Sequence, residues 1–249
     1  MKVTRSGDTG HNTTAAAALI CDAEAAMKLI LVPTDMSETA SHALRYASAL
    51  AYRFDAHLLV IYADPAMPTD AARELLELHI ERNVSPRVSY EAGVFAQSPA
   101  HAIVEQACDT GADLIVMGTH GRTGLRRLIV GSVTEAVIRR ATVPVIVVNA
   151  YSSEQAALKT VVASSFEMLL PKELLDCTEI KAVFYPISAE EIVDFARRNR
   201  ADLIALDVTA AGKSVQKILH LSACPVLTLN EHTMRTDRER QMTTAAAVW

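Results

Sequence analysis

The 249-residue sequence is poor in aromatic residues and in glycine, and it has no paired cysteine motif. Aromatic residues make up 5% of the chain and hydrophobic residues 50%, so a core has to be built mainly from alanine, valine, leucine and isoleucine. The four cysteines are widely spaced, without a C-x-x-C pair, and Cys108 and Cys224 lie in apolar segments. This spacing disfavours a disulfide framework or a zinc site and predicts reduced thiols that are buried or inert.

The chain also lacks an excess of basic residues and a long apolar run. Its formal net charge of −5 argues against a general binder of nucleic acid or of anionic membranes. No stretch approaches the roughly 20 apolar residues of a membrane span, so we expect a soluble, cytoplasmic protein. In residues 1–26 a short apolar run is closed by Asp22 and Glu24, which favours a disordered extension over a signal peptide.

Four of the nine glycines are concentrated in one segment, GTHGRTGLRRLIVGSVT, between an apolar run and a helical pattern. Glycine lets backbone N–H groups approach a ligand closely, and a helix N-terminus offers further donors and a partial positive charge. Ser132, followed three residues later by Glu135, predicts a capping box at the helix start. The segment therefore predicts a phosphate-binding loop and helix. Its glycines are Gly118, Gly121, Gly124 and Gly131.

From residue 28 onward, strand patterns alternate with helix patterns. Helices are expected to begin at Ser37 and Ser98 and to cover residues 71–82, with a further helix after the glycine-rich segment. The order βαβαβαβαβ predicts an α/β fold with a Rossmann-like, doubly wound parallel sheet of five strands, whose ligands bind at the carboxyl ends of the strands. The expected strands cover residues 29–32, 58–62, 87–91, 113–117 and 143–148.

Three segments together resemble the universal stress protein family, in its ATP-binding subgroup. The spacing of Gly118, two residues, Gly121, nine residues and Gly131 followed by serine is similar to the nucleotide-binding signature of that family. Residues 27–40 resemble its first strand and turn, and residues 141–149 resemble its last strand. The resemblance covers residues 27–149. It implies that the chain binds ATP, accompanied by Mg or Mn, and acts as a stress-response regulator.

The resemblance also assigns individual residues to the nucleotide. Pro33, Thr34 and Asp35 follow the first strand and are expected at the ribose or adenine, while the alternative for Asp35 is to cap the following helix. Tyr62, at the end of the second strand, matches a position that contacts adenine mainly through its backbone. The residues expected to surround the phosphates are Gly118, His120, Gly121, Arg122, Gly124, Gly131, Ser132, Val133 and Thr134.

Nothing in the segment predicts catalysis. It lacks a G-x-x-x-x-G-K-[ST] loop and any lysine, and no nucleophile or general base with a partner lies near it. We therefore expect a regulator rather than an enzyme. By resemblance, slow ATP hydrolysis or self-phosphorylation on the same site is an alternative, and a nucleotide-independent interaction module is a third. An adenylating enzyme is disfavoured, because PTDMSE stands where those enzymes carry an S-G-G-x-D-S-like loop.

The second half of the chain repeats parts of the first. ADLI recurs at residues 201–204, and VPVIVVN at residues 143–149 matches CPVLTLN, which begins 81 residues later. Between these matches the glycine loop is missing, and Asp207 replaces Gly118. Since the repeated scaffold does without this loop, the loop is better explained by a ligand than by folding.

This repeat predicts a tandem organisation, with a nucleotide-binding domain at 27–150, a smaller degenerate repeat at 155–231 and a loose tail at 232–249. Residues 160–165 are expected to form the first strand of the repeat, and Ser188 with Glu191 predicts a helix cap in it. By family resemblance the last strands pair at their edges. The resemblance thus implies a homodimer or an intramolecular pseudo-dimer.

Overall fold

A computed structural model describes residues 27–66, 69–119, 130–150, 152, 156, 158–163, 179–182 and 188–233. The extension at 1–26 and most of the expected tail lie outside the described residues. The described chain does continue two residues into that tail, where Thr233 is buried and donates its backbone N–H to Asn230 Oδ1 at 2.9 Å.

The chain alternates strands and helices through both halves. The strands are β1 (Leu29–Pro33), β2 (His57–Ala63), β3 (Tyr90–Phe95), β4 (Leu114–Gly118), β5 (Val145–Val148), β6 (Thr160–Ala163), β7 (Glu179–Ala182), β8 (Leu203–Asp207) and β9 (Val226–Leu229). The helices are α2 (Glu38–Phe54), α3 (Thr69–Asn83), α4 (Pro99–Asp109), α5 (Ser132–Arg140), α7 (Ala189–Arg198), α8 (Val208–Ala211) and α9 (Ser214–Leu221).

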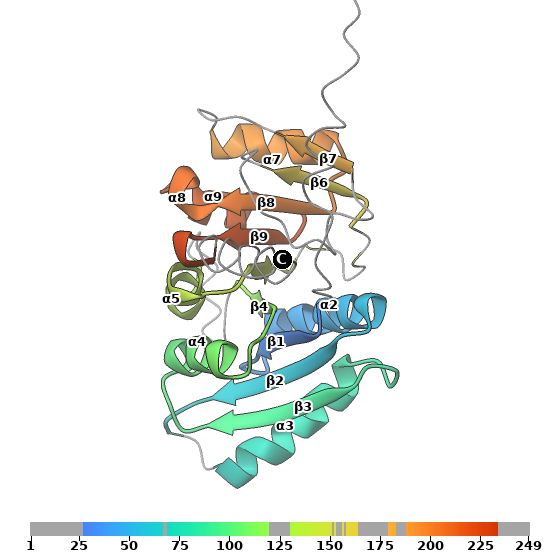
Figure 1. Cartoon of the computed structure of the whole chain (residues 1–249), viewed down its shortest axis with the longest axis vertical. Helices are drawn as coiled ribbons and strands as arrows, with labels where there is room; N and C mark the ends of the chain where they lie inside the picture. The colour runs from blue at the N-terminus through green and yellow to red at the C-terminus, as the bar shows by residue number, and fades with distance from the viewer. Residues whose placement is uncertain are drawn as a thin grey trace, which may run out of the picture.

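All these strands form one sheet in the order β3-β2-β1-β4-β5-β9-β8-β6-β7 (Figure 1). The pairs within β1–β5 are all parallel, which confirms the predicted five-stranded, doubly wound first half. In the second half β6 pairs in parallel with β7 and β8, and β8 with β9. The two halves meet where β5 pairs with β9. Outward from this seam, the order β5-β4-β1-β2 in the first half corresponds to β9-β8-β6-β7 in the second. The described residues of the second half hold no counterpart of β3.

The seam joins the halves through the antiparallel pairing of β5 and β9, so the two last strands pair within one chain, as expected. Ile146 lies opposite Leu227, and these two residues occupy equivalent places in the matching segments VPVIVVN and CPVLTLN. The neighbouring pairs, Val145 with Thr228 and Val147 with Val226, are symmetric about this one. Such self-complementary pairing is the geometry of a two-fold interface.

Two asparagines extend this symmetry beyond the strands. Asn149 donates its Nδ2–H to the carbonyl of Ser222, the C-cap of α9, at 2.8 Å. Asn230 donates its Nδ2–H to the carbonyl of Ala141, the C-cap of α5, at 2.9 Å, and to that of Ile138 at 2.8 Å. Each half therefore satisfies backbone carbonyls at a helix end of the other half.

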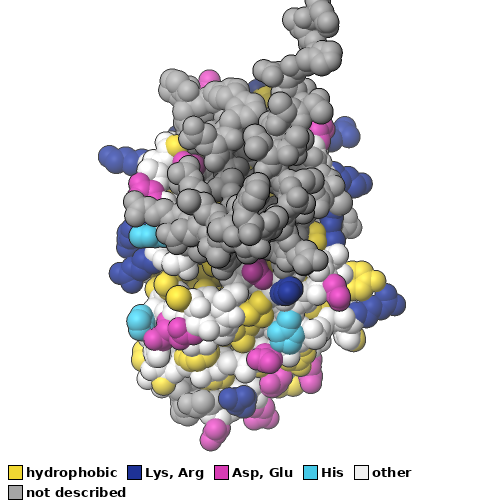
Figure 2. Space-filling view, viewed as in Figure 1, with side chains coloured by type: hydrophobic (Ala, Val, Ile, Leu, Met, Phe, Trp, Pro, Cys, Tyr) yellow, Lys and Arg dark blue, Asp and Glu magenta, His cyan; other side chains and the backbone are white. Residues whose placement is uncertain are grey.

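Helices cover both faces of the sheet. α2 and α3 pack on one face, and α4, α5, α7 and α9 pack on the other (Figure 1). Alternate strand residues point to opposite faces, so that Ile30 and Val32 join the first core and Leu31 joins the second. This double burial explains why the strands are continuous apolar runs in the sequence. On the described surface of the view in Figure 2, acidic and basic side chains are interspersed.

Several predicted helix ends are confirmed. Ser37 caps α2 and accepts the N–H of Ala40 at 3.2 Å. Ser188 and Glu191 form the expected capping box of α7. Beyond these predictions, Gly111 follows the C-cap of α4 in the left-handed region, with φ +66°.

Other predictions are wrong in detail. The third strand begins at Tyr90 rather than at residue 87, because β3 is an edge strand whose first two residues are exposed and give little apolar alternation. β6 covers Thr160–Ala163, and the last two residues of the strand expected at 160–165 lie outside the described residues. Ser98 holds the N-cap position of α4 without a side-chain cap bond.

The two described cysteines differ in exposure. Both are free thiols, but Cys108 is exposed and Cys224 is half-buried. Of the two expected alternatives, burial or an inert thiol, burial is excluded for Cys108, because Ala107, the preceding residue of α4, is the one that faces the core. None of the helices in the described part of the chain is long and apolar enough to cross a membrane.

Candidate functional site

A cavity of about 440 Å³ lies at the carboxyl edge of the first half of the sheet. The strand order reverses there, between β1 and β4, which is where open α/β sheets bind ligands. Nine residues that the sequence assigned to the nucleotide line this cavity: Pro33, Thr34, Asp35, Tyr62, Gly118, Gly131, Ser132, Val133 and Thr134. The other four, His120, Gly121, Arg122 and Gly124, lie outside the described residues.

Eight further residues complete the lining, and the sequence analysis did not name them. They add an apolar wall from the strands, from α2 and from α4, together with one more carboxylate at the end of β2. These residues are Ala40, Ile61, Ala63, Asp64, Pro65, Pro99, Ile103 and Met117.

The turn after β1 is held by side chains that bind its own backbone. Thr34 Oγ1 accepts the N–H of Met36 at 2.9 Å, and Asp35 Oδ1 accepts the N–H of Ser37 at 3.1 Å. Met36 has φ +63°, a left-handed conformation that is unfavourable for a residue with a side chain. Because Ser37 caps α2, the alternative that Asp35 caps this helix is wrong, and Asp35 instead stabilises the turn.

A histidine from α3 contacts the same turn. His79 Nε2 lies 3.1 Å from Thr34 Oγ1, and the Thr34 side chain is buried. Partial burial lowers the pKa of His79, and the nearby Asp35 carboxylate opposes this. No local pattern indicates this contact, because Thr34 follows a strand, His79 lies on a helix, and 45 positions of the chain separate them.

The end of β2 supplies the second carboxylate of the cavity. Tyr62 is buried and donates its hydroxyl to Asp64 Oδ2 at 3.1 Å, while Asp64 Oδ1 accepts the N–H of Ala66 at 2.9 Å. The Tyr62 hydroxyl is therefore committed to Asp64. Only one feature of the sequence indicates that Asp64 lies at the carboxyl edge of the sheet. It follows Tyr62 by two residues and begins a turn-rich stretch directly after the second strand.

The first turn of α5 borders the cavity. Its N-cap is Gly131, whose carbonyl accepts the N–H of Glu135 at 3.0 Å, so the cap lies one residue before the predicted cap and the helix begins at Ser132. Ser132 is thus a helical residue with no side-chain cap bond, and the predicted Ser132–Glu135 capping box is wrong. The first N–H groups of a helix have no acceptor within it and carry a partial positive charge. This turn can therefore donate to an anion in the cavity.

Two contacts fix this turn against the sheet. Thr134 Oγ1 donates to the carbonyl of Gly118 at 2.9 Å, and the N–H of Gly131 donates to the carbonyl of Thr119 at 2.8 Å. A Cβ atom at Gly118 would lie 3.0 Å from Thr39 Cγ2 and 3.2 Å from the Thr39 backbone. Packing against α2 therefore favours glycine at 118, which gives this residue a role in the fold besides the role toward a ligand that the sequence predicts.

The cavity has two chemically different ends. Asp35 and Asp64 offer acceptors suited to hydroxyl or amine donors, and the α5 terminus offers donors suited to an anion. Among the described lining residues there is no lysine or arginine. In the described chain no group of three or more histidine, cysteine, aspartate or glutamate residues could hold a metal ion.

The equivalent edge of the second half is built differently. Asp207 ends β8, and its Oδ1 accepts the N–H groups of Thr209 at 2.8 Å and of Ala210 at 3.2 Å. This carboxylate caps α8, a helix that begins directly at the end of the strand. Where Gly118 opens to a cavity, the second half thus has a helical turn capped by Asp207.

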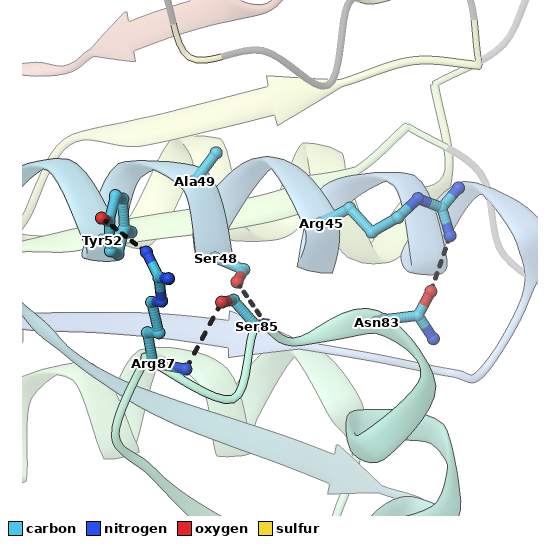
Figure 3. A pocket seen from close by; sticks show the side chains of 7 residues that line it. All are labelled: Arg45, Ser48, Ala49, Tyr52, Asn83, Ser85 and Arg87. Carbon is cyan, nitrogen blue, oxygen red and sulfur yellow. Dashed lines mark hydrogen bonds between the residues drawn. The ribbon is translucent and has the colours of Figure 1, made fainter.

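A second hollow of about 440 Å³ lies between α2 and the chain that leads from α3 to β3 (Figure 3). Arg87 donates to the Tyr52 hydroxyl at 3.3 Å, and its guanidinium lies 6.0 Å from the centre of the Tyr52 ring. Arg45 donates to Asn83 Oδ1 at 2.6 Å. This hollow shares no lining residue with the cavity at the carboxyl edge, and we assign it no ligand.

Known proteins resemble this chain in sequence and in fold. The model of the universal stress protein family matches residues 27–149. A universal stress protein of Methanocaldococcus jannaschii is 37% identical over 148 residues, which cover 53% of this chain and 87% of that protein. One from Thermus aquaticus is 31% identical over 135 residues, covering 49% and 98%. A crystal structure of a universal stress protein from Archaeoglobus fulgidus covers 82% of this chain and 96% of its own, with a TM-score of 0.54 and 15% identity, a likeness of fold alone.

Proposed function

We propose that this chain, which belongs to the universal stress protein family, binds ATP in the cavity at the carboxyl edge of β1, β2 and β4. The observation that carries the proposal is the convergence, in one cavity, of nine residues that the sequence assigned to a nucleotide. The cavity volume of about 440 Å³ lies within the range of about 300–1,000 Å³ that is usual for small-molecule sites. Occupancy by the nucleotide would change the surface or assembly of the protein, which thus acts as a stress-response regulator.

The nucleoside would lie against the ends of β1 and β2. Asp35 and Asp64 can accept hydrogen bonds from ribose hydroxyls or from the adenine amino group. Ile61, Ile103 and Met117 line the same cavity and offer apolar contact to the base. The hydroxyl of Tyr62 is bound to Asp64, so a contact of Tyr62 with the nucleotide would be made by its backbone.

The phosphates would lie at the start of α5. The backbone N–H groups of Ser132, Val133 and Thr134 belong to the first turn of the helix, where the partial charge favours an anion. His120, Gly121, Arg122 and Gly124, which lie outside the described residues, are proposed to complete the cradle because of their place in the family signature. Since no protein cluster in the described chain is suited to a metal ion, Mg²⁺ or Mn²⁺ would be carried by the phosphates themselves.

The second half is proposed to be a degenerate repeat of the same domain that binds no nucleotide. The shared strand order and the symmetric seam support the repeat. The carboxylate of Asp207 and the helix that follows it directly stand where the first half has its cavity, and a carboxylate repels phosphate. We therefore expect one nucleotide per chain.

We propose binding without appreciable hydrolysis. Both carboxylates in the cavity lining, those of Asp35 and Asp64, already accept a backbone N–H. Both carboxylates are therefore engaged in holding the turns that line the cavity, whereas a general base has to take a proton from the attacking water.

The nucleotide can be identified by denaturing the purified protein and analysing the released small molecules by mass spectrometry. Calorimetric titration of the emptied protein with ATP and Mg²⁺ then gives affinity and stoichiometry. We expect adenine nucleotide in the first measurement and close to one site per chain in the second. Absence of any adenine nucleotide in both measurements would refute the proposal, and two sites per chain would refute the account of the second half.

A matched pair of variants locates the site. Gly131 has φ −57° and ψ 144°, which valine also adopts, so Gly131→Val adds bulk beside the cavity with little backbone strain. We expect it to reduce ATP affinity by at least about tenfold, or about 1.4 kcal/mol. Ala210→Val adds comparable bulk at an exposed place on the corresponding edge of the second half, and it should bind ATP like the unmodified protein. Equal affinity of the two variants would mean that the start of α5 does not bind the phosphates.

A further inference from the structure

His79 connects helix α3 to the turn that lines the cavity. Its Nε2 lies 3.1 Å from Thr34 Oγ1, and Thr34 is only 7% exposed. The same Thr34 oxygen accepts the N–H of Met36, the residue with φ +63°. His79 therefore holds the side chain that stabilises the unfavourable conformation of this turn.

The position of His79 is itself fixed from outside the cavity. Asn83 donates its Nδ2–H to the His79 carbonyl at 2.7 Å, and Arg45 of α2 donates to Asn83 Oδ1 at 2.6 Å. Figure 3 shows Arg45 reaching from α2 toward Asn83 at the end of α3. A chain of hydrogen bonds thus ties α2 to the last turn of α3, which carries the imidazole.

The proton on His79 decides what Thr34 can offer to a ligand. A hydroxyl has one donor hydrogen and two acceptor positions, and Met36 uses one of the acceptors. In the neutral tautomer that has its hydrogen on Nδ1, Nε2 carries no proton, so the Thr34 hydroxyl donates to Nε2 and keeps one acceptor position. When the imidazole is protonated, Nε2–H donates to Thr34, and the hydroxyl hydrogen becomes available to the cavity.

We infer that His79 is a positioning residue of the nucleotide site, and that its protonation converts Thr34 from an acceptor into a donor toward the ligand. The inference rests on the proposed function, since it describes how that same site is held and regulated. The imidazole does not line the cavity, and it acts through Thr34.

The charged groups around His79 set the pH range of the change. Burial lowers its pKa, Asp35 from the β1 turn raises it, and Arg45 of α2 and Arg82 of α3 lower it further. The imidazole is therefore neutral at pH 7 and gains its proton below its ordinary value of 6.5. A bound nucleotide is an anion and favours the protonated form, so by linkage its affinity rises as the pH falls through this range.

The test measures ATP affinity with Mg²⁺ by calorimetry at pH 7.5 and at pH 5.5, with circular dichroism as the check on folding. At pH 7.5 we expect His79→Ala to bind about three- to tenfold more weakly, which is the usual effect of losing one hydrogen bond. His79→Gln keeps a hydrogen-bonding group and should recover most of that loss. If His79→Ala binds ATP as tightly as the unmodified protein, His79 does not position the site.

The second readout is the ratio of the affinities of the unmodified protein and of His79→Gln. Protonation of ATP affects both proteins equally, so it cancels in this ratio. We expect the ratio to rise about threefold from pH 7.5 to pH 5.5, because only His79 can gain a proton that favours the anion. His220→Gln, on α9 in the second half, is the matched control and should follow the unmodified protein. A ratio that stays constant would overturn the role of the proton.

A further measurement separates this inference from the proposed function. The His79 titration can be followed by NMR without any nucleotide, in the unmodified protein and in Thr34→Val. Loss of the hydroxyl removes a donor to the neutral ring and an acceptor from the imidazolium, and because the bond to the charged ring is the stronger one, the His79 pKa should fall further in the variant. An unchanged pKa refutes the contact between His79 and Thr34. A lowered pKa in a protein that binds no adenine nucleotide would instead leave the contact standing and refute the nucleotide site.

Discussion

Replacing Asn230 by alanine removes a side chain that links the two halves of the sheet. Asn230 is 7% exposed, and its amide donates to the carbonyls of Ile138 and Ala141 in the other half. Its Oδ1 also accepts the N–H and the hydroxyl of Thr233. Four hydrogen bonds at about 0.5–1.5 kcal/mol each give an expected loss of about 2–6 kcal/mol in the free energy of unfolding, because the buried carbonyls gain no water in exchange.

Urea denaturation followed by circular dichroism measures this loss, and a thermal scan should show a decrease in Tm of about 5–15 °C for a chain of this size. Asn199→Ala is the matched control. Asn199 also donates to a carbonyl at a helix end, that of Phe195 at 2.8 Å, but within its own helix. Its loss should cost only about 1 kcal/mol. If the two variants lose the same free energy of unfolding, the contacts of Asn230 across the seam add no stability beyond that of a bond within one helix.

Three other predictions concern single side chains. Gly118→Ala should lower the free energy of unfolding by about 1–3 kcal/mol, because its Cβ would lie 3.0 Å from Thr39 Cγ2, and an unchanged urea midpoint would contradict this packing. Tyr46→Phe should leave stability unchanged or raise it by up to about 1 kcal/mol, since the buried Tyr46 hydroxyl has no hydrogen-bond partner in the described structure, and a marked loss would reveal one. Iodoacetamide should alkylate the exposed Cys108 before Cys224, because burial raises the pKa of the Cys224 thiol. Peptide mass spectrometry measures the order of alkylation, and the reverse order would contradict the placement of the two thiols.

The elements that could be predicted from the sequence are those with a strong local signal. β1 and β4 are apolar runs because both of their faces are buried, and the residues at their ends were placed correctly at the carboxyl edge. β3 was displaced because an edge strand with exposed first residues shows little alternation. The start of α5 was misplaced by one residue, because a serine with a glutamate three residues later suggests a cap even where the preceding glycine provides it.

The parts of the site that escaped prediction depend on contacts between distant segments. His79 reaches Thr34 from a helix that follows the next strand, and no local pattern marks such a pair. Asp64 belongs to the cavity because Tyr62 and the turn after β2 orient it, which becomes visible only in three dimensions. The packing of Gly118 against Thr39 is also a contact between distant segments. The glycine motif predicts only a ligand contact for Gly118, and this packing gives it a role in the fold as well.

Both halves of the chain have the strand that forms the seam, but only the first half has the cavity at the start of α5. This difference has a physical reason. The seam residues, such as Ile146 opposite Leu227, contribute strand pairing and burial, so their loss is expected to cost folding stability. The backbone N–H groups of Ser132, Val133 and Thr134 have no acceptor within α5, so the helix does not depend on them, and a proposed repeat without this cavity can still fold. Gly131→Val should therefore weaken ATP binding without lowering the urea midpoint, and Asn230→Ala should lower the midpoint without weakening ATP binding to the folded protein. A variant at either place that changed both quantities together would show that the site and the seam are coupled.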